Sequence, residues 1–129
     1  MVYTNEQKKQ LTDLIAKWQD RLRLQHWHIT VDWDEPADVD NGLEIGTPAN
    51  RHVAEIRVGC FFDDSVTDAE RENMVCHELV HLLLWRFEDV ALRAADELSA
   101  QAASMHRKEL DAALEWAVDA LANAFVPIN

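Results

Sequence analysis

The sequence predicts a small α+β fold in which a short, mostly antiparallel sheet packs on helices, the last of them long. Apolar residues recur at helical spacing over residues 4–25, and they do so again from about residue 68 onward. Between these regions, residues 27–33 and 53–59 alternate strictly between apolar and polar side chains, which is typical of half-buried strands. The two periodicities together predict the α+β class.

Length and composition predict one folded domain over residues 1–129. The chain has 129 residues, of which 48% are hydrophobic and 28% charged, with only three glycines and three prolines. A chain of this length buries roughly 65 to 70% of its unfolded surface, so it can form a core without disulfides. Because Cys60 and Cys76 are too few for a disulfide framework, we expect two buried thiols.

The charge of the chain argues against some classes of partner. Acidic residues number 24 against 12 basic ones, which gives a net charge of −12 and disfavours binding to a nucleic-acid backbone. A basic protein partner remains compatible with this charge. No apolar run is long enough to span a bilayer, and the first residues lack the apolar region of a secretory signal. We therefore expect a cytoplasmic protein that binds no membrane.

Two capping boxes and an uninterrupted C-terminal region predict the helices. Thr4 with Gln7 begins the first helix, and Thr67 with Glu70 precedes a second helix that begins near residue 68. Residues 90–125 are rich in alanine and leucine and contain neither glycine nor proline. This composition predicts one long helix or two.

The segment between the two predicted strands is acidic and carries a turn signal. It contains Asn41-Gly42, the dipeptide best suited to a tight hairpin turn. Its oxygen-bearing side chains do not fall at the alternate positions before Gly42 that a calcium loop requires. We expect a turn here and no calcium site.

The predicted second helix carries the sequence HELVH at residues 77–81. Residues four apart share one face of a helix, so the imidazoles of His77 and His81 can reach one ion. Glu78 lies one step round the helix, where its carboxylate can accept a proton from metal-activated water without being a ligand. The pattern therefore predicts a hydrolytic zinc site with Glu78 as general base.

A catalytic zinc ion needs a third protein ligand. The metzincin pattern would require glycine at position 84 and histidine at position 87, where this chain has leucine and phenylalanine. A helical hairpin that reverses at residues 88–89, with Asp89 as the next N-cap, would place residue 97 opposite His81. Register alone does not decide between Asp96 and Glu97.

These residues resemble the zincin metallopeptidases of the gluzincin kind, in particular the minimal phage-type zincin-like metallopeptidases. The resemblance covers roughly residues 53–108, and HELVH is its one specific motif. It implies a zincin-like domain, a zinc cofactor, and a third ligand near the start of the next helix, which maps to Glu97. It also implies that the strand at residues 53–59 borders the cleft and binds extended peptide, with Glu55 or Arg57 facing either substrate or solvent.

The sequence thus predicts a zinc peptidase in which His77, His81 and Glu97 bind the metal and Glu78 activates water. Tyr3 and His106 are the weak candidates for stabilising the oxyanion. Two alternatives stay open: a catalytically idle, zinc-stabilised acidic module that binds a basic protein, and a metal-dependent hydrolase of another bond.

Overall fold

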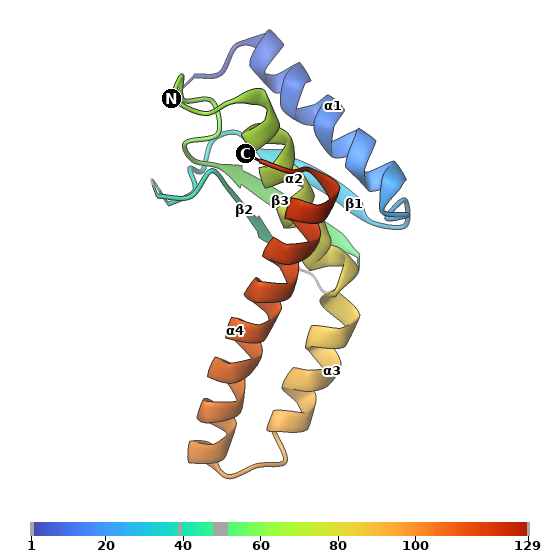
Figure 1. Ribbon diagram of the computed structural model, residues 1–129, viewed down its shortest axis with the longest axis vertical. Coiled ribbons are helices and arrows are strands. Elements are labelled where there is room, and N and C mark those ends of the chain that lie inside the picture. The colour runs from blue at the N-terminus through green and yellow to red at the C-terminus, as the bar shows by residue number, and fades with distance from the viewer. Residues whose placement is uncertain (1, 39, 48–51, 129) are drawn as a thin grey trace.

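The computed structural model describes residues 2–38, 40–47 and 52–128, and these form four helices and three strands (Figure 1). In chain order the elements are α1 (Asn5–Arg21), β1 (His28–Asp32), β2 (Leu43–Gly46), β3 (Val53–Val58), α2 (Asp68–Leu83), α3 (Trp85–Ala95) and α4 (Ala100–Phe125). The predicted α+β class is confirmed at this level. None of the described helices combines the length and the apolar character that crossing a bilayer requires.

The sheet is mixed, with strand order β1-β3-β2. β1 runs parallel to β3, with His28 opposite Val53, and β2 runs antiparallel to β3, with Leu43 opposite Val58. The expectation of a mostly antiparallel sheet was wrong, because one of the two strand pairs is parallel. β2 lies between β1 and β3 in sequence and pairs with β3 on the side opposite β1. The strand at residues 53–59 was expected at the border of a cleft, but β3 lies in the centre of the sheet. The free edge on the α2 side belongs to β2.

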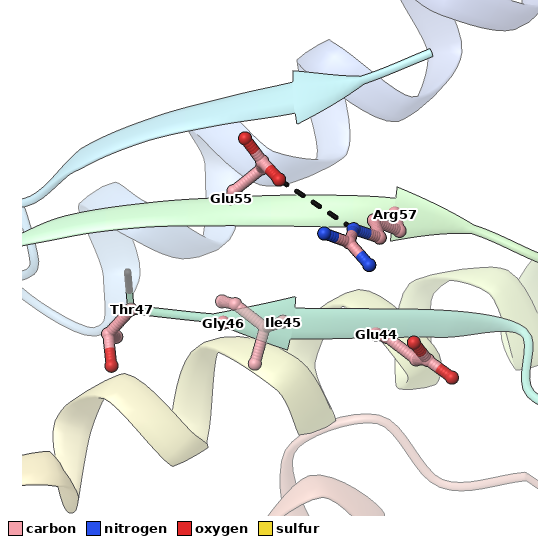
Figure 2. A pocket seen from close by; sticks show the side chains of 6 residues that line it. All are labelled: Glu44, Ile45, Gly46, Thr47, Glu55 and Arg57. Atoms are coloured by element: carbon pink, nitrogen blue, oxygen red, sulfur yellow. Dashed lines mark ion pairs between the residues drawn. The ribbon is translucent and has the colours of Figure 1, made fainter. Parts of the chain in front are cut away.

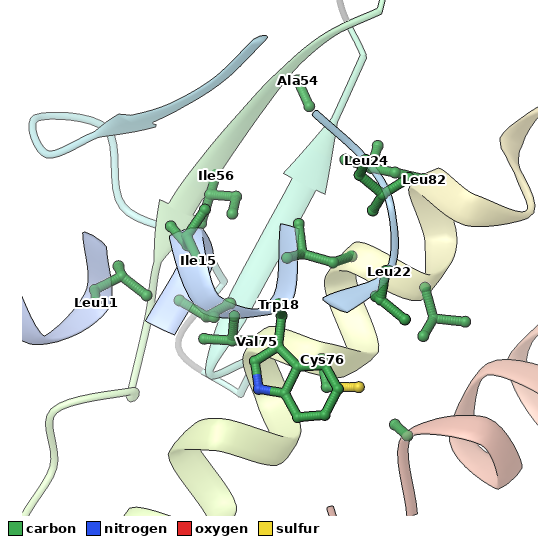
Figure 3. Close-up of a cluster of buried hydrophobic side chains, with 14 of the residues drawn as sticks. Leu11, Ile15, Trp18, Leu22, Leu24, Ala54, Ile56, Val75, Cys76 and Leu82 are labelled. Carbon is green, nitrogen blue, oxygen red and sulfur yellow. The ribbon is translucent and has the colours of Figure 1, made fainter. Parts of the chain in front are cut away.

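One face of the sheet is apolar and supports the core. Ala54, Ile56 and Val58 of β3 are almost fully buried, and they join residues of α1 and α2 in a single hydrophobic cluster. Figure 3 shows this cluster, to which α1 contributes Leu11, Ile15 and Trp18, and α2 contributes Val75 and Cys76. The buried Cys76 agrees with the expectation from the sequence, whereas Cys60 is only partly buried.

Both predicted capping boxes are present. The Thr4 and Thr67 side chains accept from the backbone N–H groups of Gln7 and Glu70, whose side chains accept in return from the cap backbones. This pairing satisfies N–H groups that a helix start otherwise leaves unbonded, which explains why α1 and α2 begin where the sequence predicts.

The chain reverses later than the sequence suggested. α2 ends at Leu83, α3 follows after a single residue, and the turn toward α4 occupies residues 96–99 rather than 88–89. Asp89 is not a helix cap, because it lies within α3 and pairs with Arg93 at 3.1 Å between Oδ2 and Nη2. Ser99 caps α4 instead, accepting from the Ala102 N–H. In Figure 1, α3 and the first half of α4 project from the sheet as a helical hairpin.

Candidate metal centre

α2 places His77, Glu78 and His81 on the side of the helix that faces away from the core. Val75, Cys76, Leu79 and Val80 of the same helix are fully buried, whereas the two histidine side chains keep 21% and 24% of their surface exposed. The imidazole centroids of His77 and His81 lie 5.1 Å apart. The spacing of four residues thus brings both rings to one place, as the sequence predicted.

The third potential ligand is Glu115 on α4, which the sequence alone did not identify. Its Oε1 lies 3.0 Å from His81 Nε2, and its Oε2 lies 3.6 Å from His77 Nε2. Ligand atoms of these three residues all lie within 4.8 Å of one another. A zinc ion with bond lengths of about 2.0–2.1 Å separates its tetrahedral ligands by about 3.3 Å, so these distances fit one shared ion.

The structure does not bring Glu97 to the histidine pair. Glu97 lies in the turn between α3 and α4, and the neighbouring Asp96 accepts from Arg107 Nη2 at 3.0 Å. The expected position of Glu97 depended on a reversal at residues 88–89, which lie inside α3 in the structure. With the reversal centred between residues 97 and 98, position 114 stands opposite His81 and position 118 opposite His77.

The residues at those two positions explain how Glu115 reaches the site. Leu114 and Val118 are buried, and α4 packs against α2. Glu115 and Asp119 each follow one of these buried residues and share one face of α4. Two acidic residues four apart, each next to a buried apolar residue, are the signal in the sequence that would have pointed to this helix face.

Asp119 holds His77 in a defined orientation. Its Oδ1 lies 3.0 Å from His77 Nδ1, on the opposite side of the ring from the nitrogen that faces Glu115. A carboxylate that accepts from one ring nitrogen leaves the other nitrogen unprotonated and free to bind a metal. Asp119 is therefore a positioning residue for His77.

Glu78 lies beside the ligand set in a largely buried environment. Burial raises the pKa of its carboxyl group to about 8, with further contributions from the charges of Glu115 and Glu44, while the backbone N–H of Ile45 opposes the shift. Burial also lowers the pKa of His81, which favours the neutral imidazole, and the charge of Glu115 opposes that effect. Neutral imidazole is the form that binds metal.

Two adjacent pockets, which share four lining residues, open the site to solvent along β2. Both are lined by Ile45, Glu78, His81 and Glu115. One, of about 350 Å³, continues toward the start of α3, and the other, of about 440 Å³, continues toward Asn41 and Glu44. Glu78 and two of the potential ligands are therefore accessible to a molecule that enters from either side.

Glu55 and Arg57 lie away from this centre. They point to the polar face of the sheet, where Arg57 Nε lies 3.7 Å from Glu55 Oε1, and they line a separate pocket of about 320 Å³ (Figure 2). The lining of this pocket includes Glu44 and Ile45 but neither histidine. Because β3 is the central strand, β2 separates both side chains from the histidine pair.

The two candidates for oxyanion stabilisation also lie elsewhere. The Tyr3 ring packs on Trp33 and Phe62, with centroids 5.3 and 5.6 Å apart. His106 lies nine residues before Glu115 on α4, about 13 Å along the helix axis. Neither residue lines the two pockets of the centre.

The donor set of the centre is two imidazoles and one carboxylate. Hydrolytic zinc sites use this set with one position left for water, so the residues present fit a catalytic zinc ion. A scan against protein-family models, a search of curated proteins and a search of solved structures each returned no match. The chemistry of the side chains is therefore the basis for assigning an activity.

Proposed function

We propose that this protein is a zinc-dependent peptidase in which His77, His81 and Glu115 hold the metal and Glu78 acts as general base. The observation that carries the proposal is the position of Glu78. Its carboxylate is not one of the potential ligands, but it lies beside them and lines two pockets that are open to solvent. A purely structural zinc site has no use for such a base and is closed by a fourth protein ligand. The resemblance to gluzincins is retained, with Glu115 in place of Glu97.

The proposed reaction divides the chemistry between the metal and the protein. When bound, zinc would lower the pKa of a coordinated water and polarise the substrate carbonyl. Burial favours the protonated form of Glu78, whereas the positive charge of a bound zinc ion would favour its carboxylate. In that form Glu78 accepts a proton from the attacking water as the new C–O bond forms. It then donates that proton to the amine as the C–N bond breaks, so that one water is consumed for each peptide bond. Asp119 keeps the His77 ring in place throughout.

The free edge of β2 provides a place for an extended substrate. Gly59 N donates to Gly42 O at 2.9 Å, and the register therefore makes Glu44 with Arg57 a hydrogen-bonded pair. By the same alternation, the backbone groups of Leu43 and Ile45 point away from β3, toward the metal centre. A peptide that added to this edge as a further strand would lie across the potential ligands. The sequence led us to expect such peptide binding at β3, and we propose that it occurs at β2 instead.

The substitution Glu78→Gln tests this proposal. Zinc-loaded wild-type protein should hydrolyse members of a mixed peptide library, with products identified by mass spectrometry. Glu78→Gln should bind the same amount of zinc but lose at least about a hundredfold in rate, because the amide cannot accept the proton. Equal activity of the two preparations would contradict the mechanism, since it would point to a contaminating peptidase or another base.

A second candidate function is the acidic module that binds a basic protein. Two observations favour it: the net charge of −12, and exposed apolar side chains on α3 and α4, including Phe87 and Trp116 at 66% and 75% exposure. Glu78→Gln separates the two functions, because a binding module would keep its partner in this variant and show no hydrolysis in either form.

A further inference from the structure

The pocket of about 350 Å³ beside the metal centre has an apolar wall and a charged end. Ile45, Leu82 and Trp85 contribute apolar surface, and Glu88 contributes a carboxylate beyond them. His81, Trp85 and Glu88 are spaced four and three residues apart across the junction of α2 and α3, which places them along one side of this segment. The pocket therefore leads from a potential metal ligand, past an indole ring, to the carboxylate of Glu88.

Trp85 is held in position by aromatic neighbours. Its ring lies edge-on to Trp27, with centroids 5.6 Å apart, and 5.9 Å from the ring of His52. Trp27 itself is only 4% exposed, so it belongs to the core and fixes the indole that lines the pocket. A fixed aromatic wall of this kind packs well on the methylene groups of a long side chain and attracts a cation through its ring face.

Glu88 is the carboxylate of this pocket that the proposed chemistry does not use. Glu115 belongs to the ligand group and Glu78 is the base, whereas the ion pairs among the described residues do not include Glu88. Its neighbour Asp89 is already paired with Arg93. A half-buried carboxylate beside an apolar wall is stabilised by a cation that enters the pocket.

We propose that this pocket binds the side chain of a lysine or arginine residue next to the bond that is cleaved, with Glu88 pairing with its charge. The inference rests on the proposed peptidase function and adds its substrate class. The methylene groups of the basic side chain lie along Leu82 and Trp85, and its charged end reaches Glu88. An acidic side chain is repelled there, and a neutral one leaves the carboxylate unpaired. The net charge of −12 also attracts basic peptides from solution.

The direct test measures binding without hydrolysis. Zinc-loaded Glu78→Gln protein is titrated calorimetrically with two capped pentapeptides of alanine that carry either arginine or its neutral isostere citrulline in the centre. The arginine peptide should bind about tenfold more tightly, since citrulline keeps the shape and removes the charge. Adding Glu88→Gln should abolish this preference. Adding Glu109→Gln instead, which removes one exposed charge on α4 and not in the pocket, should preserve the preference for arginine.

Cleavage of a peptide library by the wild-type protein gives the second readout. Cleavage sites should be enriched next to lysine and arginine, and Glu88→Arg should shift the enrichment toward glutamate and aspartate. If cleavage occurs but arginine and citrulline peptides bind equally, the pocket proposal is overturned and the peptidase proposal stands. If the arginine preference is present and depends on Glu88 but no peptide is cleaved, the peptidase proposal fails and the pocket stands. An equal loss of binding for both peptides in Glu88→Gln would also overturn the proposal, because it would show a structural role.

Discussion

Glu72 joins the first helix to the helix that carries the candidate metal centre. Its Oε1 accepts from Trp18 Nε1 at 3.0 Å and also pairs with Lys17 Nζ, so that one carboxylate binds two residues of α1. These contacts lower the pKa of Glu72, first through the hydrogen bond from Lys17, although burial opposes the shift. A carboxyl group with a lowered pKa in the folded state stabilises the fold above its unfolded pKa, and that contribution disappears as the pH falls through the folded value.

We therefore predict that Glu72→Gln lowers the free energy of unfolding at pH 7 by about 1 kcal/mol. The difference between wild type and variant should shrink as the pH falls from the unfolded pKa of a glutamate toward the lowered pKa of Glu72, and it should be absent below that lowered pKa, because the wild-type carboxyl is then also neutral. Urea denaturation at pH 7 and in steps toward pH 3 measures both effects. Asp13→Asn is the matched control, since Asp13 pairs with Lys9 across two exposed side chains and should contribute little. A pH-independent difference for Glu72→Gln would contradict the account.

Asp119 allows a residue-scale test of the metal centre that leaves every proposed ligand in place. Asp119→Asn removes the carboxylate whose Oδ1 lies 3.0 Å from His77 Nδ1, so the ring loses the charge that orients it. We predict that zinc affinity, measured against a competing chelator, falls by about tenfold or more. Asp111→Asn, an exposed position on the same helix, is the control and should leave the affinity unchanged. Equal affinities for Asp119→Asn and wild type would exclude the positioning role.

At the scale of elements, the starts of α1 and α2 were predictable because local signals determine them. The capping boxes at Thr4 and Thr67 lie within four residues of sequence, and the HELVH spacing places two histidines on one face of any helix. β2 was missed because a four-residue strand between turn residues has too little alternation to detect. The reversal at residues 96–99 was missed because Asp89, a good capping residue by type, lies instead inside α3. That error placed Glu97, rather than Glu115, opposite the two histidines.

The position of β2 depends on a close approach at Gly59. A Cβ atom there would lie 1.9 Å from the backbone oxygen of Asn41 and 2.8 Å from that of Asp38, in the segment that leads into β2. Backbone atoms cannot move aside as a flexible side chain can. The hydrogen bonds from Gly59 N to Gly42 O and from Cys60 N to Asn41 O keep this segment in place.

We predict that Gly59→Ala lowers the free energy of unfolding by about 1–3 kcal/mol, because the added methyl group forces the backbone apart. Gly46→Ala is the matched control: it lies in β2 itself, and no atom is within 4 Å of its added Cβ. Thermal or urea denaturation of the two variants beside wild type measures the contrast. Equal stabilities for Gly59→Ala and Gly46→Ala would show that the close approach does not constrain the strand.

For the whole molecule, the candidate metal centre joins parts of the chain that are distant in sequence. His77 and His81 come from α2, and Glu115 comes from α4 after the projecting hairpin has returned. In an acidic chain of net charge −12, the carboxylates of Glu78, Glu115 and Asp119 gather at one place, and a divalent cation there would offset their repulsion. A metal ion that binds the folded chain but not the unfolded chain also stabilises the fold by mass action.

The measurement that tests this account most directly is zinc content per chain, by mass spectrometry of the untagged protein after zinc is supplied and the excess removed. Wild type and Glu97→Gln should each retain one zinc per chain, because Glu97 lies in the turn between α3 and α4. His81→Ala and Glu115→Gln should lose it, and circular dichroism should show that both remain folded. Zinc retained in Glu115→Gln but lost in Glu97→Gln, or no uptake by wild type, would contradict the proposed ligand set.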